Sequence, residues 1–329
     1  MAKTRKKKQS FAQVLKDQFD FDTSGLASYI DEQSDEIIEE LVLGAALVSR
    51  VQVMEGVKGS EKIKLLSMDT PLQSAEACGK TPSGDIIFTD KTITASAVKI
   101  DMSTCNKTLK GTWAQMLLAL GKRAEKENLP LEDVITAFVI KRAKLKNQDL
   151  MLKGDTLSTN PDLAHYDGFI KKWVADALLY NIPYTGVMSV TNAFARFQAL
   201  ANAIPDVLLD NAIQPEIICS RVDAQLVVNN IYNDKDYASG LDVKYEGSEM
   251  SFVLPTTNVT VRSYAQLATG QVFCVPYEFM FFATDLEGDI EDFWLKYEEI
   301  QEKLYFGAEW GSGVQYVYAD YFGKLTVTP

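Results

Sequence analysis

Residues 131–154 read LEDVITAFVIKRAKLKNQDLMLKG and carry the clearest helical pattern in the chain. Their apolar side chains follow the i, i+3, i+4, i+7, i+8 spacing that lines one face of a helix, as Leu131, Val134, Ile135, Phe138 and Val139. The acids Glu132 and Asp133 suit a first turn, and Gly154 suits a stop. The pattern predicts a helix over 131–152, about 30 Å long at ~1.5 Å per residue.

Upstream of this helix the pattern changes from helical to alternating. Residues 108–127 again have helical spacing and end at Asn128 and Pro130. Before them, apolar residues occupy alternate positions at Ile86, Phe88, Ile93, Ala95 and Ala97. This alternation predicts a long two-stranded hairpin with its turn near Thr89–Lys91. A lone hairpin is barely stable in water, so we expect it to need a partner surface.

The N-terminal segment predicts two short amphipathic helices. One covers residues 10–19, and the other follows a cap at Ser34 with an apolar face that runs from Ile37 to Val48. Two such helices do not make a core by themselves, so we expect them to pack on another part of this chain or on a neighbour.

The second half mixes helices and strands, which indicates an α+β fold. We expect a helix capped by Thr191, a buried strand over 216–219, and a second helix opened by the capping box Ser220–Asp223. Further strands are predicted at 242–246, 250–254, 258–264, 272–283 and 314–328. Residues 289–304 fit both a helix and a strand.

Composition describes a folded chain with an uneven charge. The 329 residues are 47% hydrophobic and 24% charged, with a net charge of -12. The first ten residues carry five bases and no acid, so the rest of the chain carries 28 bases against 45 acids and a net charge of -17. Such a body should repel duplex DNA. The basic residues Lys3 to Lys8 suit contact with nucleic acid or an acidic neighbour, or a solvated terminus.

The sequence lacks the segments that would direct it to a membrane or out of the cell. No apolar run is long enough to span a bilayer, and no secretory signal is visible, so we expect no membrane partner. The cysteines Cys78, Cys105, Cys219 and Cys274 include no CxxC pair, which favours a reduced, cytosolic protein.

The sequence offers no candidate catalytic, cofactor-binding or metal-ligating residues. His165 is the one histidine and has no partner motif, so it is predicted to lie in a surface loop. The glycines from Gly307 to Gly313 lack the phosphate-binding spacing and are predicted to form a turn between strands. The acidic run Asp285–Asp292 lacks the EF-hand pattern and is predicted to be a solvated loop. The C-terminal aromatics, from Trp294 to Phe322, favour a sheet core or an interface. We therefore expect no enzyme.

The order of these elements resembles the Hong Kong 97-type major capsid protein of tailed double-stranded DNA bacteriophages. The stretches that carry the resemblance are residues 73–105 for the extended hairpin, 131–152 for the spine helix, Leu150–Thr156 and Tyr166–Ile170 for the passage out of it, Pro215–Ser220 and 250–264 for the axial domain, Phe282–Asp289 for the return, and 291–322 for the peripheral strands. The resemblance covers about Leu41 to Phe322, and it favours strand at 289–304.

The resemblance implies a domain plan. It has an N-terminal arm and helix over 1–60, an extended hairpin loop over 61–105, a peripheral domain over 106–174 and 285–329, and an axial domain over 175–284.

The resemblance also implies a function: self-assembly as pentamers and hexamers into an icosahedral phage head that encloses double-stranded DNA without sequence-specific contact. The expected partners are other copies of the chain and separate scaffolding, portal and decoration proteins, with assembly in the host bacterial cytoplasm and a final place in the virion. No signature of a lysine–asparagine cross-link is visible, and Lys80 and Lys91 are predicted to be solvated lysines in the hairpin.

Three other functions stay open. The first is an encapsulin-type nanocompartment shell, which has the same fold. The second is an α+β ligand-binding protein or enzyme, against which stands the lack of any convergent motif. The third is a nucleic-acid-binding protein, against which stands the acidic body.

Overall fold

The computed structural model describes residues 40–68, 86–105, 131–233, 241–246, 249–285, 293–298 and 303–328. The chain divides into two compact units, each assembled from separate segments. The first comprises Met1–Val42, Lys99–Ala143 and Gly288–Glu309, and the second comprises Leu43–Val98, Lys144–Glu287 and Trp310–Pro329. Helices and strands mix along the described chain, as an α+β fold requires.

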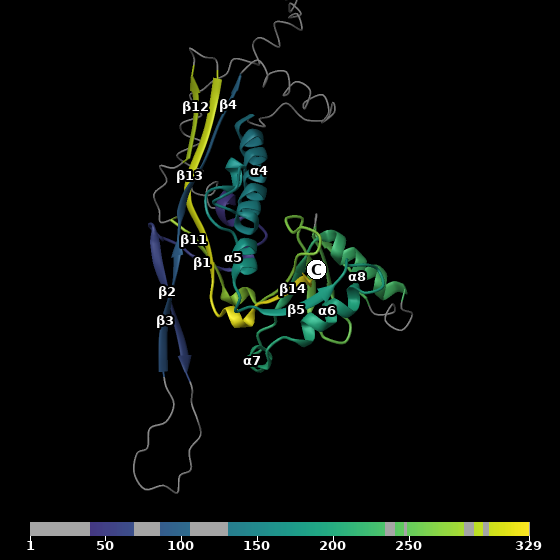
Figure 1. The fold of residues 1–329 in the computed structure, drawn as a ribbon. Coiled ribbons are helices and arrows are strands. Elements are labelled where there is room, and N and C mark those ends of the chain that lie inside the picture. Colours follow the sequence, from purple (N-terminus) through teal and green to yellow (C-terminus); the bar gives the residue numbers. More distant parts are fainter. Residues whose placement is uncertain are drawn as a thin grey trace, which may run out of the picture. The chain divides into compact units, whose positions relative to one another are not determined.

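Helices and strands follow one another along the chain as labelled in Figure 1, with η for a 3-10 helix. They are η1 (Val48–Arg50), β1 (Gln52–Met54), β2 (Ser60–Met68), β3 (Ile86–Thr94), β4 (Ser96–Cys105), α4 (Leu131–Lys153), η2 (Pro161–Leu163), α5 (Phe169–Ala175), β5 (Tyr180–Thr185), α6 (Ala193–Asn202), α7 (Asp206–Asp210), β6 (Glu216–Cys219), α8 (Arg221–Asn233), β7 (Lys244–Glu246), β8 (Glu249–Val253), β9 (Thr260–Ser263), β10 (Val272–Val275), η4 (Tyr277–Phe279), β11 (Met280–Thr284), β12 (Phe293–Glu298), β13 (Lys303–Tyr316), η6 (Ala319–Tyr321) and β14 (Gly323–Thr328).

The long helix α4 is confirmed almost residue for residue. Residues 150–152 of its last turn are buried, and the chain then crosses itself where the Gly168 backbone N–H donates to the carbonyl oxygen of Gly154 at 2.8 Å. A Cβ atom at Gly154 would lie 2.4 Å from the backbone oxygen of Tyr166. The helix therefore stops at a crossing that has no room for a side chain.

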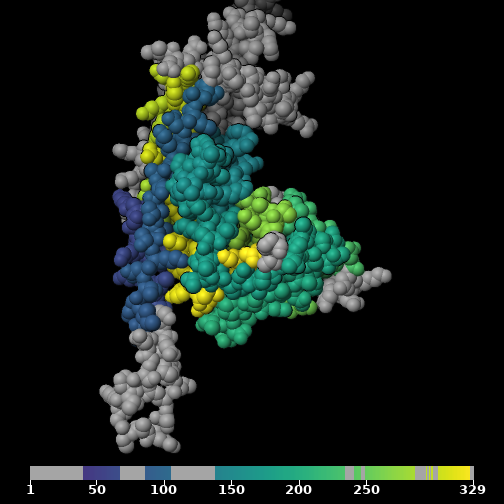
Figure 2. All heavy atoms as spheres, viewed as in Figure 1, coloured from purple at the N-terminus to yellow at the C-terminus, as the bar shows by residue number. Residues whose placement is uncertain are grey.

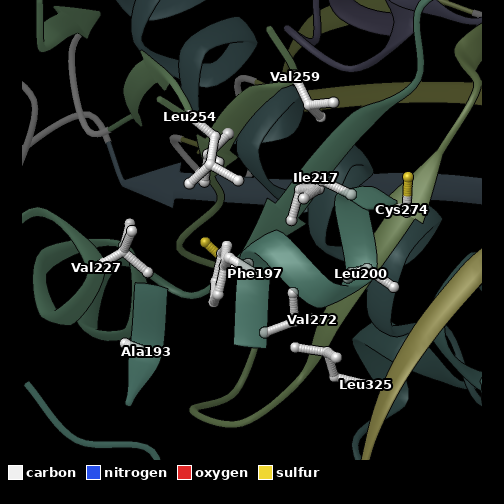
Figure 3. Packing of buried hydrophobic residues seen from close by; sticks show 14 of the residues in the cluster. Ala193, Phe197, Leu200, Ile217, Val227, Leu254, Val259, Val272, Cys274 and Leu325 are labelled. Carbon is white, nitrogen blue, oxygen red and sulfur yellow. The ribbon is translucent and has the colours of Figure 1, made fainter. Parts of the chain in front are cut away.

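The second unit contains a seven-stranded sheet in the order β5-β14-β10-β6-β9-β8-β7. The buried strand β6 lies at its centre, as expected from its apolar sequence. Helices α6 and α8 contact each other and the sheet. Figure 3 shows Phe197 and Leu200 of α6 among Ile217, Val272 and Leu325 of the strands, all of which belong to one buried cluster. This core is complete within the unit.

The two helices of this core begin differently. The Ser220 hydroxyl accepts from the Asp223 backbone N–H at 3.1 Å and donates to the Asp223 carboxylate at 2.8 Å, so the predicted capping box of α8 is confirmed. The cap predicted at Thr191 is wrong by one residue, because Asn192 precedes α6. Asn192 accepts from the Ser189 backbone N–H, which closes the turn before the helix.

The strand β13 corrects the glycine turn predicted at 307–313. The glycines lie inside this 14-residue strand, which pairs with β12 along its first half and with β11 along its second. Gly307 lies under the Trp294 ring, and a Cβ at Gly313 would lie 2.0 Å from the Thr94 backbone oxygen. Glycine is needed here for close approach, not for a turn. The ambiguity at 289–304 is resolved in favour of strand for its described residues, 293–298 and 303–304.

Two predicted long strands are each broken by a 3-10 turn. The stretch 272–283 becomes β10 and β11 with η4 between them, directly after Pro276. The stretch 314–328 becomes the end of β13 and then β14, with η6 between them. Near the start, the predicted apolar helix face does not continue to Val48, because the helix ends before Gly44 and Val48 opens η1.

The hairpin predicted around Thr89–Lys91 is wrong, because β3 runs through these residues and the following strand β4 does not pair with it. The hairpin of the structure is formed by β2 and β3 instead. β2 pairs antiparallel with β3, with Ser60 opposite Thr94 and Met68 opposite Ile86. Thr89–Lys91 therefore lies in the middle of β3 and forms no turn. Two long strands lie side by side in Figure 1 as a ribbon, and β4 pairs with β13 instead.

Some predictions fall outside the described residues. These are the helices at 10–19 and 108–127, the cap at Ser34, the basic residues Lys3 to Lys8, Cys78, Lys80 and the acidic residues 286–292. The division into arm, hairpin, peripheral domain and axial domain stays a prediction.

Candidate functional site

The described part of the chain shows no cluster of the side chains that usually carry catalysis or metal binding. His165 is exposed in a loop, as predicted, and Cys219 and Cys274 are buried free thiols. Among the residues whose placement is described, no group of three His, Cys, Asp or Glu side chains is arranged to hold a metal ion. Within the same residues, no helix combines the length and the apolar character needed to cross a bilayer.

The inner face of the hairpin packs on the body of the second unit. Ile63 of β2 and Ile93 of β3 are buried and share a cluster with Val57, Ala283 and Val317. The alternation of the strands places these side chains on one face, with Leu65 packed beside them. This cluster anchors the base of the hairpin by apolar burial.

Polar contacts fix the same base to β13 and the turn after it. The Gln315 side chain donates to the Thr92 backbone oxygen at 2.8 Å, and the Tyr318 hydroxyl donates to the Leu66 backbone oxygen at 3.1 Å. The Ala95 backbone N–H donates to the Gly59 oxygen at 2.8 Å. Together with the close approach at Gly313, these contacts define where the hairpin leaves the body.

The outer face of the hairpin is open to solvent over its described residues, and it becomes apolar with distance from the base. Near the base, Lys62 pairs with Asp90 at 3.1 Å. Farther out, Leu66 and Phe88 stand opposite each other and are 49% and 74% exposed, and Ile86 beside them is 55% exposed. The purple and blue atoms of these strands lie at the surface in Figure 2. We call Leu66, Ile86 and Phe88 the outer apolar patch.

Lys91 is not the solvated lysine that the sequence predicts. It lies on the inner face of β3, with its Nζ 4.1 Å from the centre of the Tyr316 ring. Burial lowers the pKa of Lys91, and the nearby Asp176 carboxylate partly opposes that lowering. The hairpin therefore contacts the body through a charged side chain as well as through its apolar cluster.

The first unit has an open groove of about 640 Å³ over its strands. Its lining is Asp101 from β4, Trp294, Lys296 and Glu298 from β12, and Tyr305 from β13. Trp294 lies flat over Gly307, so the glycine makes room for the ring that forms part of the groove. Aromatic residues such as Trp294 and Tyr305 are enriched at protein-binding surfaces, whereas polar residues are typical of the rim of such a surface.

A buried ionic network joins strands of the seven-stranded sheet. Arg262 on β9 is buried and lies 3.0 Å from Glu216 and 3.9 Å from Glu249. Arg50 lies 3.6 Å from the other oxygen of Glu216. Two arginines thus face two glutamates, and the network holds η1 against the sheet.

A second ionic cluster closes the loop after α4. The Lys171 amine donates to Asp155 and to Asp167, each at 2.7 Å. Thr156 donates to Asp167 through both its backbone N–H and its hydroxyl, each at 2.9 Å. The hydrogen bond from Lys171 lowers the pKa of Asp155. The cluster fixes the loop where the chain crosses itself.

The sequence predicts a strand at β3, but it shows neither that β2 is its partner nor that the hairpin carries an exposed apolar patch. The outer apolar patch forms because Leu66 lies opposite Phe88, and this pairing cannot be predicted from the sequence alone. The groove and the Arg262 network join residues far apart in the chain. Phe88 is the residue that could have indicated the patch, because it is a large apolar residue in a hairpin that can bury only one of its two faces.

Sequence comparisons find nothing: no family model matches the chain, and no curated protein matches it. Structural comparison finds similar folds at low identity. One is a chain of the satellite phage P4 procapsid that includes the size determination (Sid) protein, at 11% identity and a TM-score of 0.57, covering 89% of this chain and 99% of that one. Another is from Gordonia phage Cozz, at 7% identity and a TM-score of 0.54, covering 87% of each chain.

A third structure is a virus-like particle from Pyrococcus furiosus, at 8% identity and a TM-score of 0.50, covering 91% of this chain and 99% of that one. At these identities the likeness establishes the fold. The chain has the mixed helix and strand fold of phage capsid proteins, so the resemblance noted in the sequence is confirmed at that level.

Proposed function

We propose that this chain is the major capsid protein of a tailed double-stranded DNA bacteriophage, with the Hong Kong 97-type domain plan. The observation that carries the proposal is the hairpin, which buries the base of one face on its own body and exposes the outer apolar patch on the other. Exposed apolar surface on a long two-stranded element is costly unless a partner covers it. In a shell, that partner is a neighbouring copy of the chain.

The proposed assembly uses closed rings of identical subunits. Pentamers and hexamers need heterologous contacts, in which one surface of each copy meets a different surface of the next. The hairpin supplies one such surface, and the groove at Trp294 and Tyr305 offers aromatic area for another. The net charge of -17 beyond the first ten residues suits an inner wall that must not bind packaged DNA.

The domain plan follows the same proposal. Residues 1–60 form the arm and 61–105 include the hairpin, while 106–174 with 285–329 form the peripheral domain and 175–284 the axial domain. Scaffolding, portal and decoration proteins are the other proposed partners. The chain catalyses no reaction in this proposal, assembles in the host cytoplasm and ends in the virion.

Overexpression tests the proposal directly. We expect the purified full chain to form hollow shells or capsomer-sized oligomers, seen by size-exclusion chromatography and negative-stain microscopy. A chain that stays monomeric at every concentration, with its scaffolding protein supplied, would contradict the proposal.

A shortened hairpin tests the role of the hairpin. Residues 66–88 are removed, and Leu65 is joined to its partner Thr89 by a two-residue Asn-Gly turn that suits such hairpins. The apolar base with Ile63 and Ile93 is kept, although the contact between Tyr318 and Leu66 is lost, so we expect a folded body that still unfolds cooperatively on heating. We also expect no shells, and shells from this variant would exclude the hairpin as a clamp.

An encapsulin-type shell is the second candidate, and the likeness to the virus-like particle favours it. The two candidates differ in contents. Particles isolated from the native source contain packaged DNA if the chain is a phage capsid protein, and a protein cargo if it is a nanocompartment shell. Nuclease protection and mass spectrometry of those particles distinguish the two.

A further inference from the structure

Lys91 is a charged side chain through which the base of the hairpin touches the body. Its amine lies 4.1 Å from the centre of the Tyr316 ring, within the range of a cation–π contact. The Tyr316 hydroxyl donates to the Asp176 carboxylate at the end of α5. Lys91 thus joins the hairpin to α5 through one aromatic ring.

Tyr316 has little freedom to move away from Lys91. Its ring makes edge contacts with Phe322 at 5.0 Å and with Trp173 at 6.4 Å between ring centres. Trp173 is fully buried and stacks on Phe169 at 5.3 Å. The ring under Lys91 is therefore part of a rigid aromatic cluster.

Two further lysines lie near Lys91, Tyr316 and the end of α5. Lys324 donates to the backbone oxygens of Trp173, Val174 and Asp176, which caps the end of α5. Lys172 donates to the Val314 oxygen, two residues before Tyr316 on β13. Asp176 faces Lys91 and Lys324, and Asp167 acts on Lys172 from the loop before α5. Cations outnumber the carboxylate at Asp176, so a charge on Lys172 repels the charge on Lys91.

We propose that Lys91 is a latch that holds the base of the hairpin on Tyr316, and that the charge on Lys172 sets how firmly the latch closes. If the hairpin contacts a neighbouring copy in a shell, the latch fixes the direction of that contact, and this part rests on the proposed function. The latch itself does not, because all of its groups belong to one unit of one chain.

The direction of the pH effect follows from the protonation of Lys172. Burial lowers the pKa of Lys172 from 10.5 to about 8, and the charge of Lys91 lowers it further while Asp167 opposes. The closed arrangement therefore binds the Lys172 proton less tightly than an open one does. Raising the pH through about 8 removes that proton and favours the closed latch, as long as Lys91 keeps its own.

Hydrogen–deuterium exchange on the full chain tests the latch. Protection of the β3 amides is measured at pH 7 and pH 9 and corrected for the intrinsic exchange rate. For the wild type we expect protection to rise about threefold between these values. In Lys91→Met we expect protection to fall about fivefold at pH 9, whereas Lys91→Arg keeps the cation and the protection.

Two further variants complete the test. Lys172→Gln keeps a donor for the Val314 oxygen and removes the charge, so we expect a smaller rise in protection between pH 7 and pH 9 than in the wild type, with the remainder coming from the lowered pKa of Lys91. Lys62→Met breaks the exposed pair with Asp90 on the outer face, and we expect wild-type behaviour. Equal protection in Lys91→Met and the wild type overturns the latch, and a pH dependence in Lys172→Gln as large as in the wild type overturns the role of Lys172.

Assembly is read separately on the same samples by size-exclusion chromatography. A chain that never assembles but shows the expected protection refutes the proposed function and supports the latch. If the chain builds shells but its β3 protection does not depend on Lys91 or Lys172, the proposed function is supported and the latch is refuted.

Discussion

Replacing Phe88 by serine should raise the concentration at which the chain assembles without unfolding it. The Phe88 side chain is 74% exposed in the single chain. At about 200 Å² for a Phe side chain and ~25 cal/mol per Å², covering that fraction contributes at most about 4 kcal/mol. A real interface covers only part of it, so we take about 2 kcal/mol, which is about 30-fold in the association constant of each contact.

The assay is light scattering and size-exclusion chromatography over a concentration series. Phe88→Ser should need about 30-fold more protein to assemble than the wild type. Its melting temperature should stay within a degree or two, since an exposed side chain contributes little to the folded chain.

A matched pair of leucines controls for general loss of apolar surface. Leu66 lies in the outer apolar patch, and Leu157 is 86% exposed in the loop after α4. Leu66→Ser should raise the assembly concentration as Phe88→Ser does, and Leu157→Ser should not. An unchanged assembly concentration in both Phe88→Ser and Leu66→Ser would refute the reasoning that the patch is covered in the shell.

Three other expectations concern the folded chain. Gly313→Ala puts a methyl group 2.0 Å from a backbone oxygen, so we expect a loss of about 2 kcal/mol and a fall in melting temperature of several degrees. Arg262→Met removes a buried cation beside Glu216 and Glu249 while Glu216 keeps Arg50, so we expect a loss of about 2 kcal/mol in urea unfolding, and adding Glu216→Gln should recover part of it. Lys171→Met should raise the pKa of the Asp155 carboxyl toward 3.8, measured by NMR titration, because Lys171 lowers it. The stability from that pair is present above pH 3.8 and lost as the pH falls through the lowered pKa, so the variant should begin to unfold at a higher pH than the wild type, and an unmoved Asp155 titration would contradict this.

The sequence predicted best those elements that depend on near neighbours in the chain. The helix α4 follows from its own periodicity, its acidic start and Gly154. The capping box at Ser220 and Asp223 is likewise a local pattern, and so is the short apolar strand β6. For these elements no distant residue is needed to decide the structure.

The errors lie where the structure depends on distant residues. Alternation placed β3 correctly as a strand, but it could not show that the lysine-rich segment 60–68 is its partner. The turn was therefore put inside β3. The glycines at 307–313 look like a turn because their reason, the close approach of Trp294 and Thr94, comes from other parts of the chain.

The candidate site shows the same limit more strongly. Phe88 was visible as an apolar residue, but its exposure depends on which face of the hairpin meets the body. Lys91 was expected to be solvated, although it lies on the same face as the buried Ile93. The β2–β3 register decides both the exposure of Phe88 and the inward position of Lys91, and it becomes visible only from the pairing along the whole ladder.

That register also limits how the hairpin can change during evolution. Adding two residues to each strand would lengthen its reach by about 7 Å and leave every side chain on its present face. Adding a single residue to each strand would turn the apolar patch inward and the distal inner residues outward. Related chains that vary the span between neighbouring subunits should therefore differ in this element by even numbers of residues per strand, while the base at Ile63 and Ile93 keeps its length.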